Sequence, residues 1–121
     1  MLHMSRVFLC AIVMSSLVVQ AQEVTVTGKE IQDNWVGKTL SGTAANGAPV
    51  TMKLLTDGTA TLSVGTRNDS GTWRATESGY CTTWKTIRSG QERCFTTRRS
   101  GSKVTVLNPD GSVSGRFDEI K

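Results

Sequence analysis

Two cysteines offer the clearest chemistry in this sequence. Cys81 and Cys94 are the only cysteines after residue 21, and they enclose a short segment. In an oxidising compartment, an even number of closely spaced cysteines predicts a disulfide, and closing a loop of this length stabilises a fold by about 3 kcal/mol. The alternatives are a metal-binding pair and a reactive thiol, and both lack supporting residues. We therefore expect a Cys81–Cys94 bridge and no metal site.

Basic and aromatic side chains surround the cysteines. Eight Lys or Arg residues and three acidic residues lie between positions 67 and 103. Such a cluster is typical of a site for an anionic sugar, a phosphate or an acidic protein, or else of a solvated face that keeps a small protein soluble. Aromatic side chains are typical of a core, but at a barrel mouth they can also stack on a ligand. The candidate ligand-binding residues are Tyr80, Trp84, Arg88, Arg93, Arg98 and Arg99.

The residues needed for common catalytic sites are missing. His3 is the only histidine, and it lies in the N-terminal segment. Without imidazole, the rest of the chain lacks Ser-His-Asp triads, Cys-His pairs and histidine metal ligands. Asp57 and Asp110 belong to Asp-Gly turns, and the glycines are spread among turns instead of forming a phosphate-binding loop. We predict no catalytic residues, no cofactor and no enzymatic activity.

Residues 1–21 have the pattern of an export signal. Arg6 is followed by an apolar run from Val7 to Met14, and Val19-Gln20-Ala21 fits a signal-peptidase site. The run is too short to span a bilayer well, so a membrane anchor is the weaker alternative. We predict cleavage near Ala21 and a periplasmic or secreted location. The remaining residues, 22–121, are enough for one domain with a net charge near +3.

The elements that must position these residues are mostly short strands. Alternating runs on both sides of Asp57-Gly58 predict a β-hairpin. Turn clusters at even spacing indicate about eight strands in an antiparallel meander, which can close into a small barrel. A two-sheet sandwich is the competing architecture. The other predicted turns lie at residues 67–71, 77–79, 89–91, 100–102 and 108–111.

One helix and one extended segment should precede the strands. Ile31 and Trp35 are four residues apart and Gly37 suits a helix stop, so residues 29–36 are predicted to form a short helix that docks through its apolar side. Gln22 to Thr27 is predicted to be an extended arm. The expected barrel interior comprises Leu40, Val50, Met52, Leu54, Ala60, Leu62, Val64, Trp73, Ala75, Trp84, Phe95, Val104, Val106, Val113 and Phe117.

The predicted disulfide constrains the hairpin that contains it. A tight turn at Ser89-Gly90 would not place Cys81 opposite Cys94. Because a disulfide requires Cα atoms within about 7 Å of each other, the hairpin must contain a bulge or an irregular loop. We expect this irregular loop at residues 87–92.

Six short motifs follow one another along most of the chain after the signal. They are Gly37-Lys38-Thr39, Asp57-Gly58-Thr59, Gly71-Thr72-Trp73, Cys81-x-x-Trp84, Arg93-Cys94 and Asp110-Gly111-Ser112. The series resembles a family of small exported proteobacterial proteins of unknown function with a Gly-Thr-Trp…Cys-x-x-Trp…Cys pattern. This resemblance implies a periplasmic, single-disulfide β domain with a lipocalin-like barrel architecture, and it implies no catalytic residues.

The sequence leaves two functions open. The first is a non-enzymatic binding or cell-envelope-associated module whose arginine-rich loop contacts an anionic envelope polysaccharide or lipid, or a protein partner. The second is a periplasmic protease inhibitor acting through the arm at Gln22 to Thr27, an analogy of barrel shape alone. We expect no nucleic-acid partner and no transmembrane segment after the signal. Arg93 and Arg99 share strand parity with Phe95, so one of them is expected to point toward a barrel mouth.

Overall fold

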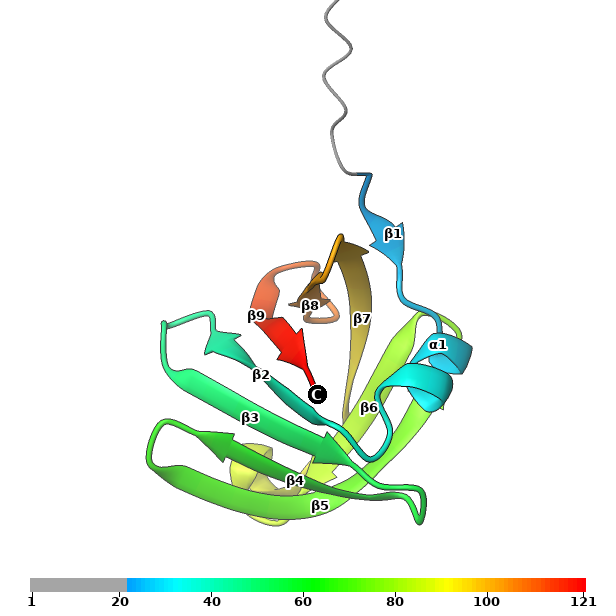
Figure 1. Cartoon of the computed structure of the whole chain (residues 1–121). Coiled ribbons are helices and arrows are strands. Elements are labelled where there is room, and N and C mark those ends of the chain that lie inside the picture. The colour runs from blue at the N-terminus through cyan, green and yellow to red at the C-terminus, as the bar shows by residue number, and fades with distance from the viewer. Residues whose placement is uncertain (1–21) are drawn as a thin grey trace, which may run out of the picture.

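The computed structural model describes residues 22–121, which form a closed antiparallel β-barrel with one short α-helix (Figure 1). Strands β2 to β9 each pair with the next strand in sequence, and β2 pairs with β9 to close the ring. The predicted barrel is confirmed, and the sandwich alternative is wrong. The predicted export signal lies outside the described residues. The elements are β1 (Val24–Thr25), α1 (Gly28–Asn34), β2 (Thr39–Ala44), β3 (Pro49–Leu54), β4 (Thr59–Val64), β5 (Arg67–Thr76), β6 (Gly79–Trp84), the 3-10 helix η1 (Ile87–Gly90), β7 (Arg93–Ser100), β8 (Lys103–Leu107) and β9 (Val113–Ile120).

The β3–β4 hairpin forms where the alternating pattern predicted it. Its ladder runs from the Val50–Val64 pair to the Leu54–Ala60 pair. In the turn, the Asp57 carboxylate accepts hydrogen bonds from the Thr59 amide at 2.9 Å and from the Thr59 hydroxyl at 2.6 Å. Gly58 adopts a φ of 85°, in the left-handed region that glycine enters without steric cost. Local turn chemistry therefore sets the register of two barrel strands.

Closure of the barrel depends on a glycine in β2. The β2–β9 ladder contains a bulge between Ser41 and Gly42. A Cβ atom at Gly42 would overlap the carbonyl oxygen of Arg116 on β9. Only glycine lets the two strands approach this closely at the bulge.

Helix α1 begins at a hydrogen-bonded cap. The Thr27 hydroxyl accepts a hydrogen bond from the Glu30 amide at 3.2 Å. The helix occupies residues 28–34, slightly earlier than predicted, and Trp35 forms its C-cap. Its axis is only two turns long, so its stability depends on packing against β5 and β6.

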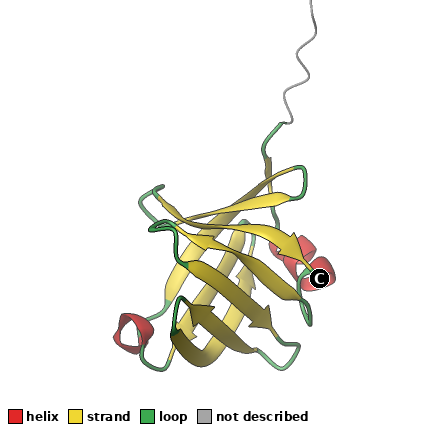
Figure 2. Ribbon diagram, turned by 60° about the vertical axis from the view of Figure 1, so that its left-hand side comes forward, coloured by secondary structure: helices red, strands yellow, loops and turns green. Residues whose placement is uncertain are grey.

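Two side chains from this region close one end of the barrel. Ile31 is fully buried and Trp35 is 2% exposed. The Trp35 ring makes edge-to-face contacts with Tyr80 and Phe117, with centroid separations of 6.0 and 6.2 Å. The predicted docking of the helix through Ile31 and Trp35 is confirmed. Helix α1 and η1 lie on opposite sides of the barrel (Figure 2).

The N-terminal segment is part of the barrel wall. Strand β1 pairs with the end of β7, and Val26 is fully buried. The Val26 amide donates to the Thr97 carbonyl at 2.8 Å, and the Val26 carbonyl accepts from the Thr97 hydroxyl at 2.9 Å. The prediction of an arm over Gln22 to Thr27 is therefore wrong where it concerns Val26, which is held by the core.

Most of the predicted interior residues are buried. Val113 is an exception at 38% exposure, because a register shift between Val106 and Leu107 changes the alternation opposite it. The predicted turn at residues 67–71 is also wrong, since β5 begins at Arg67 and the turn precedes it. The confirmed buried positions are Leu40, Met52, Leu54, Ala60, Trp84, Phe95, Val104, Val106 and Phe117.

Candidate functional site

The barrel interior contains a cavity of about 240 Å³. Residues from the strand ends around η1 line its mouth, and no residue of α1 contributes to it. The cavity therefore opens at the end opposite the helix. Its walls are mainly apolar and aromatic, and they include Val50, Met52, Leu62, Trp84, Phe95 and Phe117.

Arg88 lies at this mouth in an unusual conformation. Arg88 and Ser89 have φ values of 56° and 54°, in a left-handed region that costs a non-glycine residue roughly 1–2 kcal/mol. The Arg88 guanidinium carbon is 5.1 Å from the centroid of the Phe95 ring, which is a cation–π contact. The side chain is therefore directed onto an aromatic wall of the cavity.

The charge of Arg88 is poorly compensated. Burial lowers the pKa of Arg88, and the neighbouring positive charge of Arg93 lowers it further. Within residues 22–121, no carboxylate forms an ion pair with Arg88. Of the described residues, Arg67, Arg88 and Arg116 line the cavity and no acidic residue does. The mouth therefore favours a negative charge.

Asp69 on β5 holds the loop that contains Arg88. One carboxylate oxygen accepts hydrogen bonds from the Thr86 amide at 3.0 Å, the Thr86 hydroxyl at 2.9 Å and the Ile87 amide at 2.9 Å. The other accepts from the Ser70 amide at 2.8 Å. The hydrogen bond from the Ile87 amide contributes most to holding the pKa of Asp69 well below its usual range, and the other bonds add to it. Partial burial acts in the opposite direction. Asp69 was missed in the sequence because it lay in a predicted turn.

Strand β6 supplies two polar side chains of the cavity wall. Tyr80 and Thr82 both line the cavity and are 4% and 2% exposed. Burial raises the pKa of the Tyr80 hydroxyl, while the nearby charge of Arg88 acts in the opposite direction. The Thr82 hydroxyl has no hydrogen-bond partner within the described chain. This wall combines apolar contact with hydrogen-bonding capacity.

The structure brings three of the six predicted ligand-binding residues to one place. Tyr80, Trp84 and Arg88 all line the cavity. Arg93 is exposed at the start of β7, close enough for its charge to affect Arg88. One of Arg93 and Arg99 was expected to point toward a barrel mouth, but neither lines the cavity, and Arg93 acts on the mouth through its charge alone.

The remaining two predicted residues lie elsewhere and are paired. Arg98 lies 3.9 Å from the Glu23 carboxylate, and Arg99 donates to the Glu30 carboxylate of α1 at 2.8 Å. Their assignment to the ligand site is not supported by the geometry, because neither lines the cavity and both pair with glutamates of the N-terminal region, Glu23 directly before β1 and Glu30 in α1. Sequence reasoning instead missed Arg67 and Arg116, which line the cavity. The position of Arg67 directly after a tight turn is the one signal that could have indicated a rim residue.

The disulfide lies behind the cavity wall. Cys81 and Cys94 are directly opposite on β6 and β7, with their Cα atoms 3.9 Å apart. Cys81 points away from the cavity, because its neighbours Tyr80 and Thr82 line it. The predicted bridge is confirmed, and so is the irregular loop, which contains η1.

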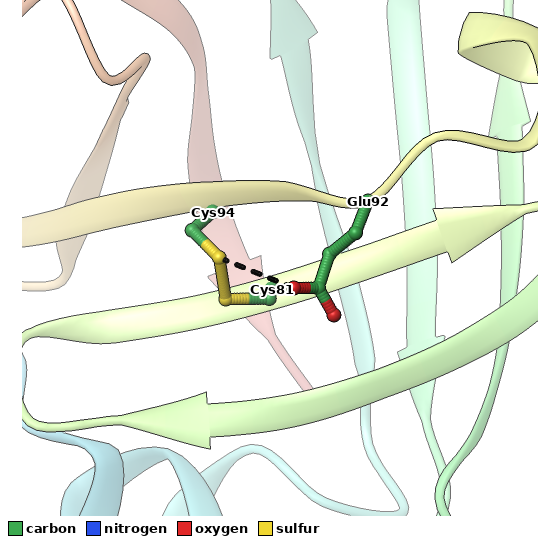
Figure 3. A group of neighbouring side chains, drawn as sticks. All are labelled: Cys81, Glu92 and Cys94. Carbon is green, nitrogen blue, oxygen red and sulfur yellow. Dashed lines mark hydrogen bonds between the residues drawn. A yellow bond between two sulfur atoms is a disulfide. The ribbon is translucent and has the colours of Figure 1, made fainter.

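A carboxylate accompanies the disulfide. Glu92 approaches Cys94 with an oxygen-to-sulfur distance of 3.9 Å (Figure 3) and receives two hydrogen bonds from Arg74 at 3.2 and 2.9 Å. Cys81, Glu92 and Cys94 are close enough to resemble a set of metal ligands. A disulfide sulfur is not a thiolate, however, so the oxidised protein offers a metal only the carboxylate. The disulfide and the Arg74–Glu92 hydrogen bonds instead stabilise the base of the loop that contains η1.

Comparisons with known proteins give no family. No family model matches the sequence, and neither a curated protein nor a solved structure matches it. Between residues 22 and 121, no helix has the length and apolar character needed to cross a membrane. Function is therefore inferred from the cavity.

Proposed function

We propose that this protein binds a small amphipathic anion inside its barrel. The apolar part of the ligand occupies the cavity, and its acidic group pairs with Arg88. On this proposal the protein is an exported, non-enzymatic binding module in the periplasm or outside the cell. The export signal predicted from the sequence is the basis for that location.

Arg88 is the observation that carries the proposal. It is half-buried, it contacts an aromatic wall, and no acidic residue between positions 22 and 121 pairs with it. Partial removal of a cation from water is costly unless an opposite charge compensates it. The left-handed backbone adds a further cost at the same residue. A ligand carboxylate, sulfate or phosphate would supply the missing partner through charge-assisted hydrogen bonds.

The size of the cavity limits the ligand. A dry apolar cavity of roughly 150 Å³ is enough to hold benzene, and sites for drug-sized ligands measure about 300–1,000 Å³. The 240 Å³ observed here suits one short hydrocarbon chain or a single ring. A polysaccharide is too large for it. Of the anionic partners considered from the sequence, a lipid-like molecule is therefore favoured.

The architecture is consistent with such a role by analogy. A closed eight-stranded barrel is just wide enough to be filled by side chains or to hold one small ligand, as lipocalins do. The analogy concerns shape only. The alternative role as a protease inhibitor gains no support, because Val26 ties the N-terminal segment to the core.

Titration of the purified, oxidised protein with decanoate tests the proposal. Binding should be detectable by calorimetry and by the fluorescence of Trp84, which lines the cavity. Decanol should bind more weakly, since it lacks the charge. Arg88→Met should weaken decanoate binding by about ten- to a hundredfold, the usual value of a hydrogen-bonded charge.

Arg98→Met is the matched control, because Arg98 is exposed and lies outside the cavity lining. It should leave the affinity for decanoate unchanged. The proposal is overturned if neither decanoate nor a hydroxylated decanoate binds, or if Arg88→Met binds the ligand as tightly as the unaltered protein does.

A further inference from the structure

Two threonines are buried in the described chain, and their hydroxyl groups differ in bonding. The Thr97 hydroxyl donates to the Val26 carbonyl at 2.9 Å, so it has a structural role. The Thr82 hydroxyl is just as deeply buried and has no hydrogen-bond partner among residues 22–121. An unpartnered buried hydroxyl lowers stability, and valine has nearly the same shape without that penalty. Stability alone therefore gives no reason for threonine at position 82.

The position of Thr82 supplies another reason. Thr82 lines the cavity between Tyr80 and Trp84, on the strand that leads into the Arg88 loop. Strand β3 contributes Val50 and Met52, which offer no hydrogen-bonding side chain, whereas β2 and β9 contribute Thr43, Ser114 and Arg116. Among the residues that line the cavity, Thr82 is the one whose buried side-chain oxygen has no hydrogen-bond partner between residues 22 and 121.

We propose that Thr82 is a specificity-determining residue, which hydrogen-bonds to a hydroxyl group on the apolar part of the ligand while the acidic group pairs with Arg88. This inference rests on the proposed function and names the ligand class. The ligand is a hydroxylated carboxylate of about the size of decanoate. A plain alkyl carboxylate would leave the Thr82 hydroxyl buried and unpaired, so it binds less tightly.

The test compares decanoate with 2-hydroxy-, 3-hydroxy- and 10-hydroxydecanoate on the same oxidised protein. The position of the hydroxyl along the chain determines which of the three reaches Thr82. At least one of them should bind about five- to tenfold more tightly than decanoate. Thr82→Val should abolish that advantage and change the affinity for decanoate by less than about twofold.

Thr97→Val is the matched control for folding. It should lower the urea midpoint, because it removes the hydrogen bond to Val26. Thr82→Val should leave the midpoint unchanged or raise it. A loss of stability in Thr82→Val as large as that in Thr97→Val would show that Thr82 is structural and would overturn the inference.

The remaining outcomes separate the two proposals. If decanoate binds but no hydroxydecanoate binds more tightly, or if the advantage survives in Thr82→Val, the inference about Thr82 is wrong and the proposed function stands. If neither decanoate nor any hydroxydecanoate binds, the proposed function fails together with the inference.

Discussion

The arginines at the two ends of the barrel differ in their ion pairing. At the end closed by α1, Arg99 donates to Glu30 at 2.8 Å beside a core filled by Trp35. At the open end, Arg88 is partly buried in a left-handed backbone conformation, and no carboxylate of the described residues pairs with it. The ion pair and the buried tryptophan of the closed end add stability, whereas the partial burial and the left-handed backbone of Arg88 cost stability. The difference suggests that the closed end maintains the fold and that the open end is kept for a ligand.

Trp35→Ala breaks the closed end and should have the largest effect. Removing a buried tryptophan that contacts Tyr80 and Phe117 is expected to lower the free energy of unfolding by about 3–5 kcal/mol. Urea denaturation measures this change. Val113→Ala serves as the control, since Val113 is exposed and its loss should cost no more than about 0.5 kcal/mol. Similar values for the two variants would mean that α1 does not close the core.

Removal of the disulfide tests how much the Cys81–Cys94 bridge stabilises the fold near the open end. The double variant Cys81→Ala/Cys94→Ala should lose about 3 kcal/mol, because the bridge closes a loop with a sequence separation of 13. As a control, both proteins are measured with and without a reducing agent. Only the unaltered protein should lose stability on reduction, because the variant has no disulfide. Equal urea midpoints for the variant and the oxidised protein would contradict a stabilising bridge.

Much of the fold could be predicted from the sequence because its determinants are local. The Asp57-Gly58 hairpin and the apolar alternation from Val50 to Val64 need only neighbouring residues. The strand at residues 67–71 was missed because polar residues there resemble a turn, whereas Asp69 is used to hold a loop. Strand β1 was missed because its pairing partner lies far along the chain.

The site was predictable by residue type and not by arrangement. Arg88, Arg98 and Arg99 look equivalent in the sequence, and only the fold shows that two of them meet glutamates from the N-terminal region. In the same way, Thr82 and Thr97 differ only in what surrounds their hydroxyl groups. Burial and pairing between distant segments decide such roles, and neither is encoded in local spacing.

Asp69→Asn is expected to weaken the hydrogen bonds that hold the loop at the open end, and to leave the closed end unchanged. The variant should exchange the amide hydrogens of Thr86 and Ile87 roughly tenfold faster at neutral pH, because the charged acceptor of their hydrogen bonds is lost. Hydrogen exchange followed by NMR measures this rate. Amides in α1 should be unaffected.

The pH dependence of the Asp69→Asn effect has a defined sign. The pKa of Asp69 is lowered in the folded state, so its contribution is fully present above the unfolded value of about 4 and is lost as the pH falls toward the native value. The difference between the two proteins should therefore stay constant near neutral pH and shrink in acid. Asp110→Asn is the control, because Asp110 bonds only within its own turn at Ser112. Unchanged exchange at Thr86 in Asp69→Asn would show that Asp69 does not hold the loop.

Arg88→Met should have the smallest effect on stability, and the comparison of the two ends depends on it. Loss of the cation–π contact with Phe95, worth about 0.5–1 kcal/mol, is offset by removal of a partly desolvated charge that has no ion-pair partner in the part of the chain that the structure describes. The free energy of unfolding without ligand should thus stay within about 0.5 kcal/mol of the original. Arg99→Met should lower it by up to about 1 kcal/mol, because Glu30 loses its partner. If Arg88→Met proves the more costly of the two, Arg88 stabilises the empty barrel, and its position at the mouth is no longer a sign of binding.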